Sequence, residues 1–211
     1  MPEVRFTLVG DGRFDQTLLP ILNWLVHASG VQVPIQGSWA DLEKMPRPTR
    51  ALKDRIARAA ELWPCDLLYV HRDAESAEPG DRIREIERAF AAASSLATIP
   101  QHVPVIPVRM TEAWLLFSED LIRQAAGNPS GRLPLSLPGQ WERLVDPKET
   151  LHEALRKASG HSGRRLASFN AVQAAYRVAE LATDFSPLRL LPTFRQVEED
   201  TAYELRVLGL L

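Results

Sequence analysis

The stretch DLLYVHRDAESAE, residues Asp66 to Glu78, decides the fold. It begins with a short apolar run, Leu67 to Val70, of the kind that forms a buried strand. The chain then passes without a turn signal into His71, Arg72 and Asp73. We therefore expect a strand whose C-terminal end carries charged and metal-ligating side chains.

Outward from this stretch, strands and helices alternate along the first half of the chain. Apolar runs predict further strands at residues 4–10, 31–37 and 103–110. Helical periodicity predicts helices at residues 14–30, 49–63 (with Thr49 as N-cap), 80–97, 111–127, 148–159, 164–182 and 191–208. Strands joined by helices imply right-handed crossovers, so we predict an α/β fold with a mainly parallel four-stranded sheet flanked by helices. A Pro/Gly/Ser-rich loop at 128–139 leads us to divide the chain into an α/β core, 1–126, and a helical C-terminal extension, 127–211, packed on it as a single structural unit.

Composition excludes several classes of protein. The 211 residues are 45% hydrophobic and 25% charged, with a formal net charge of -2, so nucleic-acid binding would depend on a local basic patch. The single cysteine, Cys65, cannot form an internal disulfide and suits a reducing compartment. The sequence shows no signal peptide and no apolar run long enough to span a bilayer, so we expect a cytoplasmic protein that does not bind membranes. It contains no GxxxxGK[ST], HExxH or GxSxG motif, which removes the support for P-loop, zinc-protease and serine-hydrolase chemistry.

Acidic residues follow three of the predicted strands. Asp11 and Asp15 follow the first, Asp73 and Glu75 the third, and Glu112 the fourth. Ligands bind at the carboxyl ends of the strands in an open parallel sheet, where neighbouring strands lie about 4.8 Å apart. Carboxylates brought together there repel one another unless a divalent cation neutralises them, and oxygen ligands favour magnesium or manganese.

Each of these residues also has a structural interpretation. Asp11 lies between two glycines and fits a turn, while Asp15 and Glu112 fit the first turn of a helix. Glu75 fits a solvated loop, and a lone histidine such as His71 is more often a hydrogen-bonded structural residue than a ligand. Asp73 has the weakest structural alternative, because it directly follows an apolar strand.

Basic residues add candidates for binding phosphate. The candidates for contacts to phosphate or nucleic acid are Arg13, Arg72, Arg109, Arg164 and Arg165. The alternative for Arg72 and Arg109 is that they only neutralise the acidic residues as ion pairs.

Together these segments resemble the Toprim family, the metal-binding domain of topoisomerases, primases and overcoming-lysogenization-type nucleases. DGRFD, with Asp11 where the family has Glu, resembles its first motif; HRDAE, with His71 in place of the first acid, resembles its Asp-x-Asp motif. RMTEAWLLFSEDL, DPKETL, GRRLASFN and DFSPLRLLPTF resemble a bacterial Toprim-like family of about this length, and this likeness covers nearly the whole chain.

The resemblance implies a Mg²⁺- or Mn²⁺-dependent phosphoryl-transfer enzyme, a hydrolase that cleaves DNA or RNA as a nuclease. It implies catalytic roles for Asp11, Asp73 and Glu112, and metal ligation by Asp11, Asp73, Glu75 and His71. Families of this kind also resemble effectors of phage defence, which often lie beside an ATPase.

Two alternatives stay open. Asp11 is one methylene shorter than the family's Glu, and His71 is a softer ligand than Asp, which fits a catalytically degraded binding or regulatory module that partners an ATPase. The second alternative is a metal-dependent nucleotide phosphohydrolase. The sequence leaves the oligomeric state open, with a homodimer among the alternatives.

Overall fold

The sheet is parallel throughout and has four strands. It is seen in a computed structural model that describes residues 3–45, 50–75 and 78–211. The strands are β1 (Val4–Val9), β2 (Ile35–Trp39), β3 (Leu67–His71) and β4 (Gln101–Val105). They lie in the order β2-β1-β3-β4, so the three strands followed by acidic residues are neighbours. The predicted α/β class is confirmed, as is the four-stranded parallel sheet with helices around it and after it.

The strand register brings the carboxyl ends of β1, β3 and β4 to one edge. Leu8 pairs with Tyr69, and His71 pairs with Val105. The contact between β3 and β4 continues beyond the strands, because the backbone N–H of Arg72 donates to the carbonyl of Val105 at 3.2 Å. The loops that follow the two strands are therefore held together.

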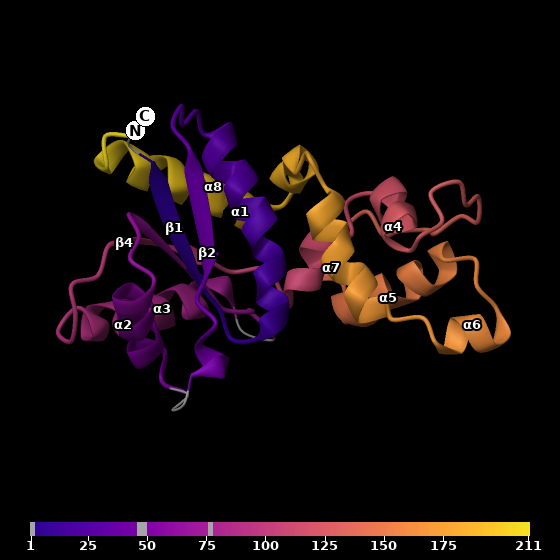
Figure 1. Ribbon diagram of the computed structural model, residues 1–211, viewed down its shortest axis with the longest axis horizontal. Helices are drawn as coiled ribbons and strands as arrows, with labels where there is room; N and C mark the ends of the chain where they lie inside the picture. The colour runs from indigo at the N-terminus through magenta and orange to yellow at the C-terminus, as the bar shows by residue number, and fades with distance from the viewer. Residues whose placement is uncertain (1–2, 46–49, 76–77) are drawn as a thin grey trace.

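Each face of the sheet has its own apolar core, because side chains alternate along a strand. On one face Phe6 and Tyr69 belong to a core that includes helices α1 (Leu18–Ala28) and α8 (Pro192–Val207). The opposite face contributes Leu68 and Val70 to a second core with helices α2 (Leu52–Leu62) and α3 (Pro79–Ala93). Figure 1 shows these helices around the strands, with β2 next to α1.

The remaining helices extend away from the sheet. They are α4 (Glu119–Ala125), α5 (Pro147–Ala158), α6 (Gly163–Ala167) and α7 (Ala171–Leu181). Figure 1 shows them together beyond α1, with α6 at the far end, while the last helix, α8, returns to the strands. The hydroxyl groups of Tyr69 on β3 and Thr201 on α8 lie 3.1 Å apart. The C-terminal helix is therefore part of the layer that covers the sheet.

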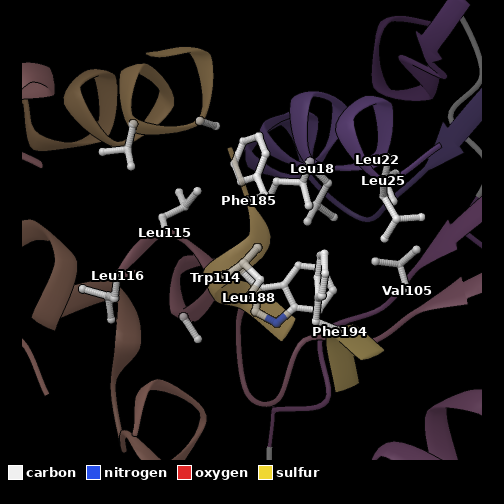
Figure 2. Packing of buried hydrophobic residues seen from close by; sticks show 14 of the residues in the cluster. Leu18, Leu22, Leu25, Val105, Trp114, Leu115, Leu116, Phe185, Leu188 and Phe194 are labelled. Atoms are coloured by element: carbon white, nitrogen blue, oxygen red, sulfur yellow. The ribbon is translucent and has the colours of Figure 1, made fainter. Parts of the chain in front are cut away.

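Trp114 joins the sheet to this helical part. Its side chain is fully buried, and its ring lies 5.4 Å from that of Phe194 in an edge-to-face arrangement. Figure 2 shows Trp114 in the centre of the core, close to Leu188 and Phe194. One continuous core thus runs from β1 and β3 to α5 and α7.

Three predicted helices are divided in the structure; the first, expected at 14–30, forms a 3-10 helix over 13–17 and then α1. Residues 111–127 form a 3-10 turn and then α4, because the Ser118 side chain accepts the backbone N–H of Leu121 and starts a new helix. Residues 164–182 form α6 and α7, because the Asn170 side chain accepts the backbone N–H of Gln173 and starts α7. Thr49, expected as the N-cap of α2, lies outside the described residues. The described 3-10 helices are η1 (Arg13–Thr17), η2 (Leu42–Lys44), η3 (Thr111–Leu115), η4 (Trp141–Arg143) and η5 (Ser186–Leu190).

Two strands are also displaced from their predicted positions. The second strand was expected at 31–37 and lies at 35–39, and the fourth was expected at 103–110 and lies at 101–105. Pro107 has no backbone N–H, so regular strand pairing ends before it. The chain from Ile106 onward is free to turn toward the carboxyl end of β3.

Candidate functional site

His71 is the centre of the carboxyl edge of the sheet. It is the last residue of β3 and is 1% exposed. Its Nδ1 lies 3.0 Å from the carbonyl oxygen of Val105. Its Nε2 lies 3.4 Å from Asp73 Oδ1 and 3.5 Å from Asp15 Oδ1. The carbonyl oxygen and the two carboxylates are acceptors, so protons on both ring nitrogens satisfy all three.

The pKa of His71 agrees with this geometry. Burial on its own lowers that pKa, but the carboxylates of Asp15 and Asp73 outweigh the burial and raise it to about 10. His71 is therefore an imidazolium that connects three strand ends. With a proton on each nitrogen, it has no lone pair to offer a metal ion.

Asp15 lies beneath this edge, in η1. Its Oδ2 accepts the backbone N–H groups of Asp11 at 2.7 Å and Gly12 at 3.0 Å. Burial raises the pKa of Asp15, but His71 and these two N–H groups together hold it below its usual range. A Cβ atom at Gly10 would come within 2.5 Å of Asp15 Oδ2, so only glycine allows Asp15 to fold back over the end of β1.

Asp73 lies on the solvent side of His71. Its Oδ1 accepts the backbone N–H of Thr111 at 3.0 Å, and its side chain is 29% exposed. The Thr111 hydroxyl lies 3.3 Å from His71 Nε2. Asp73 thus connects the loop after β3 to the loop after β4 and keeps an exposed side toward solvent.

Glu112 follows Thr111 and is 4% exposed. Burial raises its pKa, and the negative charges of Asp73 and Asp15 raise it further, against an opposing effect of Lys148 on α5. Within the described part of the chain, no arginine, lysine or histidine forms an ion pair with Glu112. Glu112 is therefore a buried carboxyl group whose pKa is raised by burial and by the charges of two other carboxylates.

Asp11 points to a different set of partners. Its Oδ1 lies 3.2 Å from Arg55 Nη1, and its Oδ2 lies 2.6 Å from Arg72 Nη1. Arg72 also contacts Glu85 on α3 at 3.1 Å. The structure thus places Asp11 among arginines, whereas it brings Asp73 together with His71 and with Thr111, the residue before Glu112.

Glu75 and Arg109 lie next to each other in the loops beyond β3 and β4. Both have positive φ, 54° and 65°, which is uncommon for residues other than glycine. The backbone N–H of Glu75 donates to the carbonyl of Arg109 at 3.0 Å. The Glu75 side chain is 70% exposed and lies 3.5 Å from Arg82.

The other expected phosphate contacts lie away from this edge or at its rim. Arg13 is exposed and lies 3.7 Å from Glu43. Arg164 and Arg165 are exposed on α6, at the end of the helical part far from the strands (Figure 1). The structure does not bring these two arginines together with Asp73 and Glu112.

Sequence reasoning missed several side chains at this edge. Arg55 lies on α2, 44 residues after Asp11, and nothing in the helix marks it among its other basic residues. Tyr176 on α7 is half-buried, and its pKa is raised by burial and then by the charge of Asp15. Only the fold shows that α2 and α7 reach the strand ends.

Comparison with known proteins gives no relative: no protein-family model, no curated protein and no solved structure matches this chain. In residues 3–45, 50–75 and 78–211, no three His, Cys, Asp or Glu side chains are arranged as a ready-made metal site. No helix within these residues combines the length and the apolar character needed to cross a membrane.

Proposed function

We propose that the chain is a divalent-metal-dependent phosphoryl-transfer enzyme, a nuclease that acts on DNA or RNA. The observation that supports this most is Glu112, a buried carboxyl group at the carboxyl edge of a parallel sheet whose pKa is raised by burial and by the charges of Asp73 and Asp15. Such crowding is unfavourable in the protein alone, and a bound cation would relieve it. Perturbed carboxyl groups at a strand edge are typical of active sites.

The donor set fits magnesium or manganese in part. Magnesium commonly binds through one or two carboxylates together with substrate phosphates, rather than within a cage made only of protein. Asp73 and Glu112 supply such a pair of carboxylates. His71 Nδ1 already lies 3.0 Å from the carbonyl of Val105 and its Nε2 lies between Asp15 and Asp73, and Asp11 is already paired with two arginines.

A cation held by Asp73 and Glu112 would supply polarisation of the phosphoryl group and a lower pKa for a water molecule. The chain's own residues would then have separate tasks. Asp73 presents an exposed oxygen toward solvent, while His71 and the Thr111 N–H fix its orientation. Glu112 would be the second carboxylate ligand, and the cation would take the place of the proton that its raised pKa favours.

The second candidate is a binding or regulatory module that keeps the fold without the chemistry and partners an ATPase. It is favoured by the neutralisation of Asp11 by Arg55 and Arg72 and by the absence of a three-ligand group in the described residues. The two candidates differ in whether Asp73 and Glu112 bind a metal ion.

Metal binding is tested by thermal unfolding with and without MnCl₂, and catalysis by incubation with plasmid DNA, single-stranded DNA and RNA. We expect Mn²⁺ to raise the melting temperature of the unmodified protein and to support cleavage. Asp73→Asn and Glu112→Gln should each remove both effects. Glu153→Gln, which removes an exposed carboxylate from α5, is the matched control and should retain both.

Two results would decide against the nuclease. If Mn²⁺ neither stabilises the protein nor supports cleavage of any substrate, the binding module is favoured. Release of phosphate from nucleoside triphosphates without strand cleavage would support a nucleotide phosphohydrolase.

A further inference from the structure

Two guanidinium groups from different parts of the fold converge on Asp11. Arg55 comes from α2 and Arg72 from the loop after β3. Each uses its Nη1 on a different oxygen of the same carboxylate, at 3.2 Å and 2.6 Å. One negative charge thus lies between two positive charges.

In this cluster the two arginine side chains are more buried than the carboxylate that they contact. Arg55 is 13% exposed and Arg72 is 24% exposed, whereas Asp11 is 42% exposed. The cations form the floor, and the carboxylate lies between them and solvent. A ligand approaching from solvent would meet Asp11 first.

The two arginines are also held from behind. Arg55 Nη2 donates to the carbonyl of Gly10, and Arg72 Nη2 lies 3.1 Å from Glu85. Glu85 is itself paired with Arg82 at 2.7 Å. The positions of the guanidinium groups therefore do not depend on Asp11 alone, and they can stay in place if Asp11 leaves.

The backbone N–H groups of Asp11 and Gly12 are bound to Asp15 Oδ2, so only the side chain of Asp11 would have to rotate for its carboxylate to leave the arginines. Among the described residues, the Nε atoms of Arg55 and Arg72 are buried without a hydrogen-bond partner, so neither arginine uses all of its donors. The pair has capacity for a ligand with more acceptor oxygens than one carboxylate.

We propose that Arg55 and Arg72 form a phosphate-binding subsite and that Asp11 fills it in the free protein. A phosphate group carries more acceptor oxygens than a carboxylate and matches the guanidinium fork, so it would displace Asp11. The subsite deepens the proposed function and rests on it for one point: Arg72 precedes Asp73, so the bound phosphate belongs to the nucleic-acid substrate. Asp11 is then an internal competitor of the substrate rather than a metal ligand.

The test is binding of inorganic phosphate, measured by calorimetry in the presence of EDTA so that no metal ion contributes. We expect Asp11→Asn to strengthen phosphate binding about tenfold, because it removes the competing charge. Glu198→Gln is the matched control: it makes the same change in net charge and frees another arginine, Arg189, which lies 2.6 Å from Glu198. This control should leave the affinity for phosphate unchanged.

Arg72→Lys provides a second variant, because it keeps the charge opposite Asp11 but loses the guanidinium fork. It should weaken phosphate binding about tenfold and remain folded by circular dichroism. Unchanged or weaker binding by folded Asp11→Asn, or an equal gain in Glu198→Gln, would overturn the proposal.

Two further arms separate the sources of phosphate and the two proposals. A dinucleotide with a 5′-phosphate and the same dinucleotide without it distinguish a terminal phosphate from a backbone diester, and binding of either supports the subsite. Phosphate binding is measured in EDTA and so does not depend on the metal site. If phosphate binds as expected but no metal-dependent cleavage is found, only the proposed nuclease activity is contradicted. If the protein cleaves nucleic acid but Asp11→Asn does not bind phosphate more tightly, only the proposed subsite is contradicted.

Discussion

The two sides of one sheet edge neutralise their carboxylates in different ways. On the α2 and α3 side, Asp11 is 42% exposed and is paired with Arg55 and Arg72. On the side of η3 and the helical part, Asp15 is buried and depends on the imidazolium of His71. Exposed pairs exchange partners with solvent ions at little free-energy change, whereas a buried charge that loses its partner is strongly unfavourable. The first side is therefore suited to ligand exchange and the second to fixing the architecture.

The largest effect should come from removing the buried cation. His71→Leu leaves Asp15 and Asp73 beside an apolar side chain, so we expect it to lower the free energy of unfolding by about 3–5 kcal/mol. Urea denaturation followed by circular dichroism measures this loss.

His152→Leu is the matched control for that substitution. His152 is also a buried histidine, but burial and then the charges of Arg156 and Lys148 lower its pKa, so it is neutral at pH 7. We expect a loss of about 1 kcal/mol or less. Equal losses in the two variants would contradict the assignment of a charged His71.

The charge of His71 also predicts a dependence on pH. Its folded pKa is raised to about 10 from 6.5, so its contribution is complete below pH 6.5 and is lost as the pH rises toward about 10. The difference in unfolding free energy between the unmodified protein and His71→Leu should shrink across this range. Other groups that titrate there are common to both proteins and cancel, so a constant difference would show that His71 is neutral in the fold.

The next substitution, at Glu112, should stabilise the protein instead of destabilising it. Glu112 has a raised pKa, so the folded protein holds its proton more tightly than the unfolded chain, and ionisation above pH 4.5 lowers stability. Glu112→Gln should therefore raise the free energy of unfolding at neutral pH by about 1 kcal/mol, as is common where a functional residue is kept at the expense of stability. The gain should vanish below pH 4.5, where the carboxyl group is protonated in both states. Destabilisation at neutral pH would mean that Glu112 has a cation partner.

Much of the fold was predictable because local patterns agree with the tertiary structure. The run from Leu67 to Val70 is buried on both faces, so its composition alone indicates an inner strand. The break within 111–127 was missed, because apolar residues such as Trp114 and Leu121 continue the helical periodicity across it. Capping by Ser118 decides the break, and a serine by itself is a weak signal in sequence.

The position of the candidate site could be predicted from the sequence, but the partners of its charged side chains could not. The sequence placed acids at three strand ends, and the sheet order makes those ends neighbours. It did not show that Asp11 and Asp15, four residues apart, have different partners, because that depends on Arg55 from α2 and on the turn at Gly10. Long-range partners of this kind carry no local signal.

The smallest loss of stability should come from a substitution at Arg72, on the α2 and α3 side of the edge. The dependence of that loss on salt distinguishes it from the loss in His71→Leu. Arg72→Gln leaves Asp11 paired with Arg55 and leaves Glu85 paired with Arg82, so each carboxylate keeps a cation. We expect a loss of less than about 1 kcal/mol in unfolding free energy, and a smaller loss still in about 1 M NaCl, where charges screen over roughly 3 Å. The loss in His71→Leu should hardly change with salt, because its partners are shielded from solvent. If urea denaturation in the two salt conditions showed the same sensitivity for both variants, the two sides of the edge would not differ in the way that their burial implies.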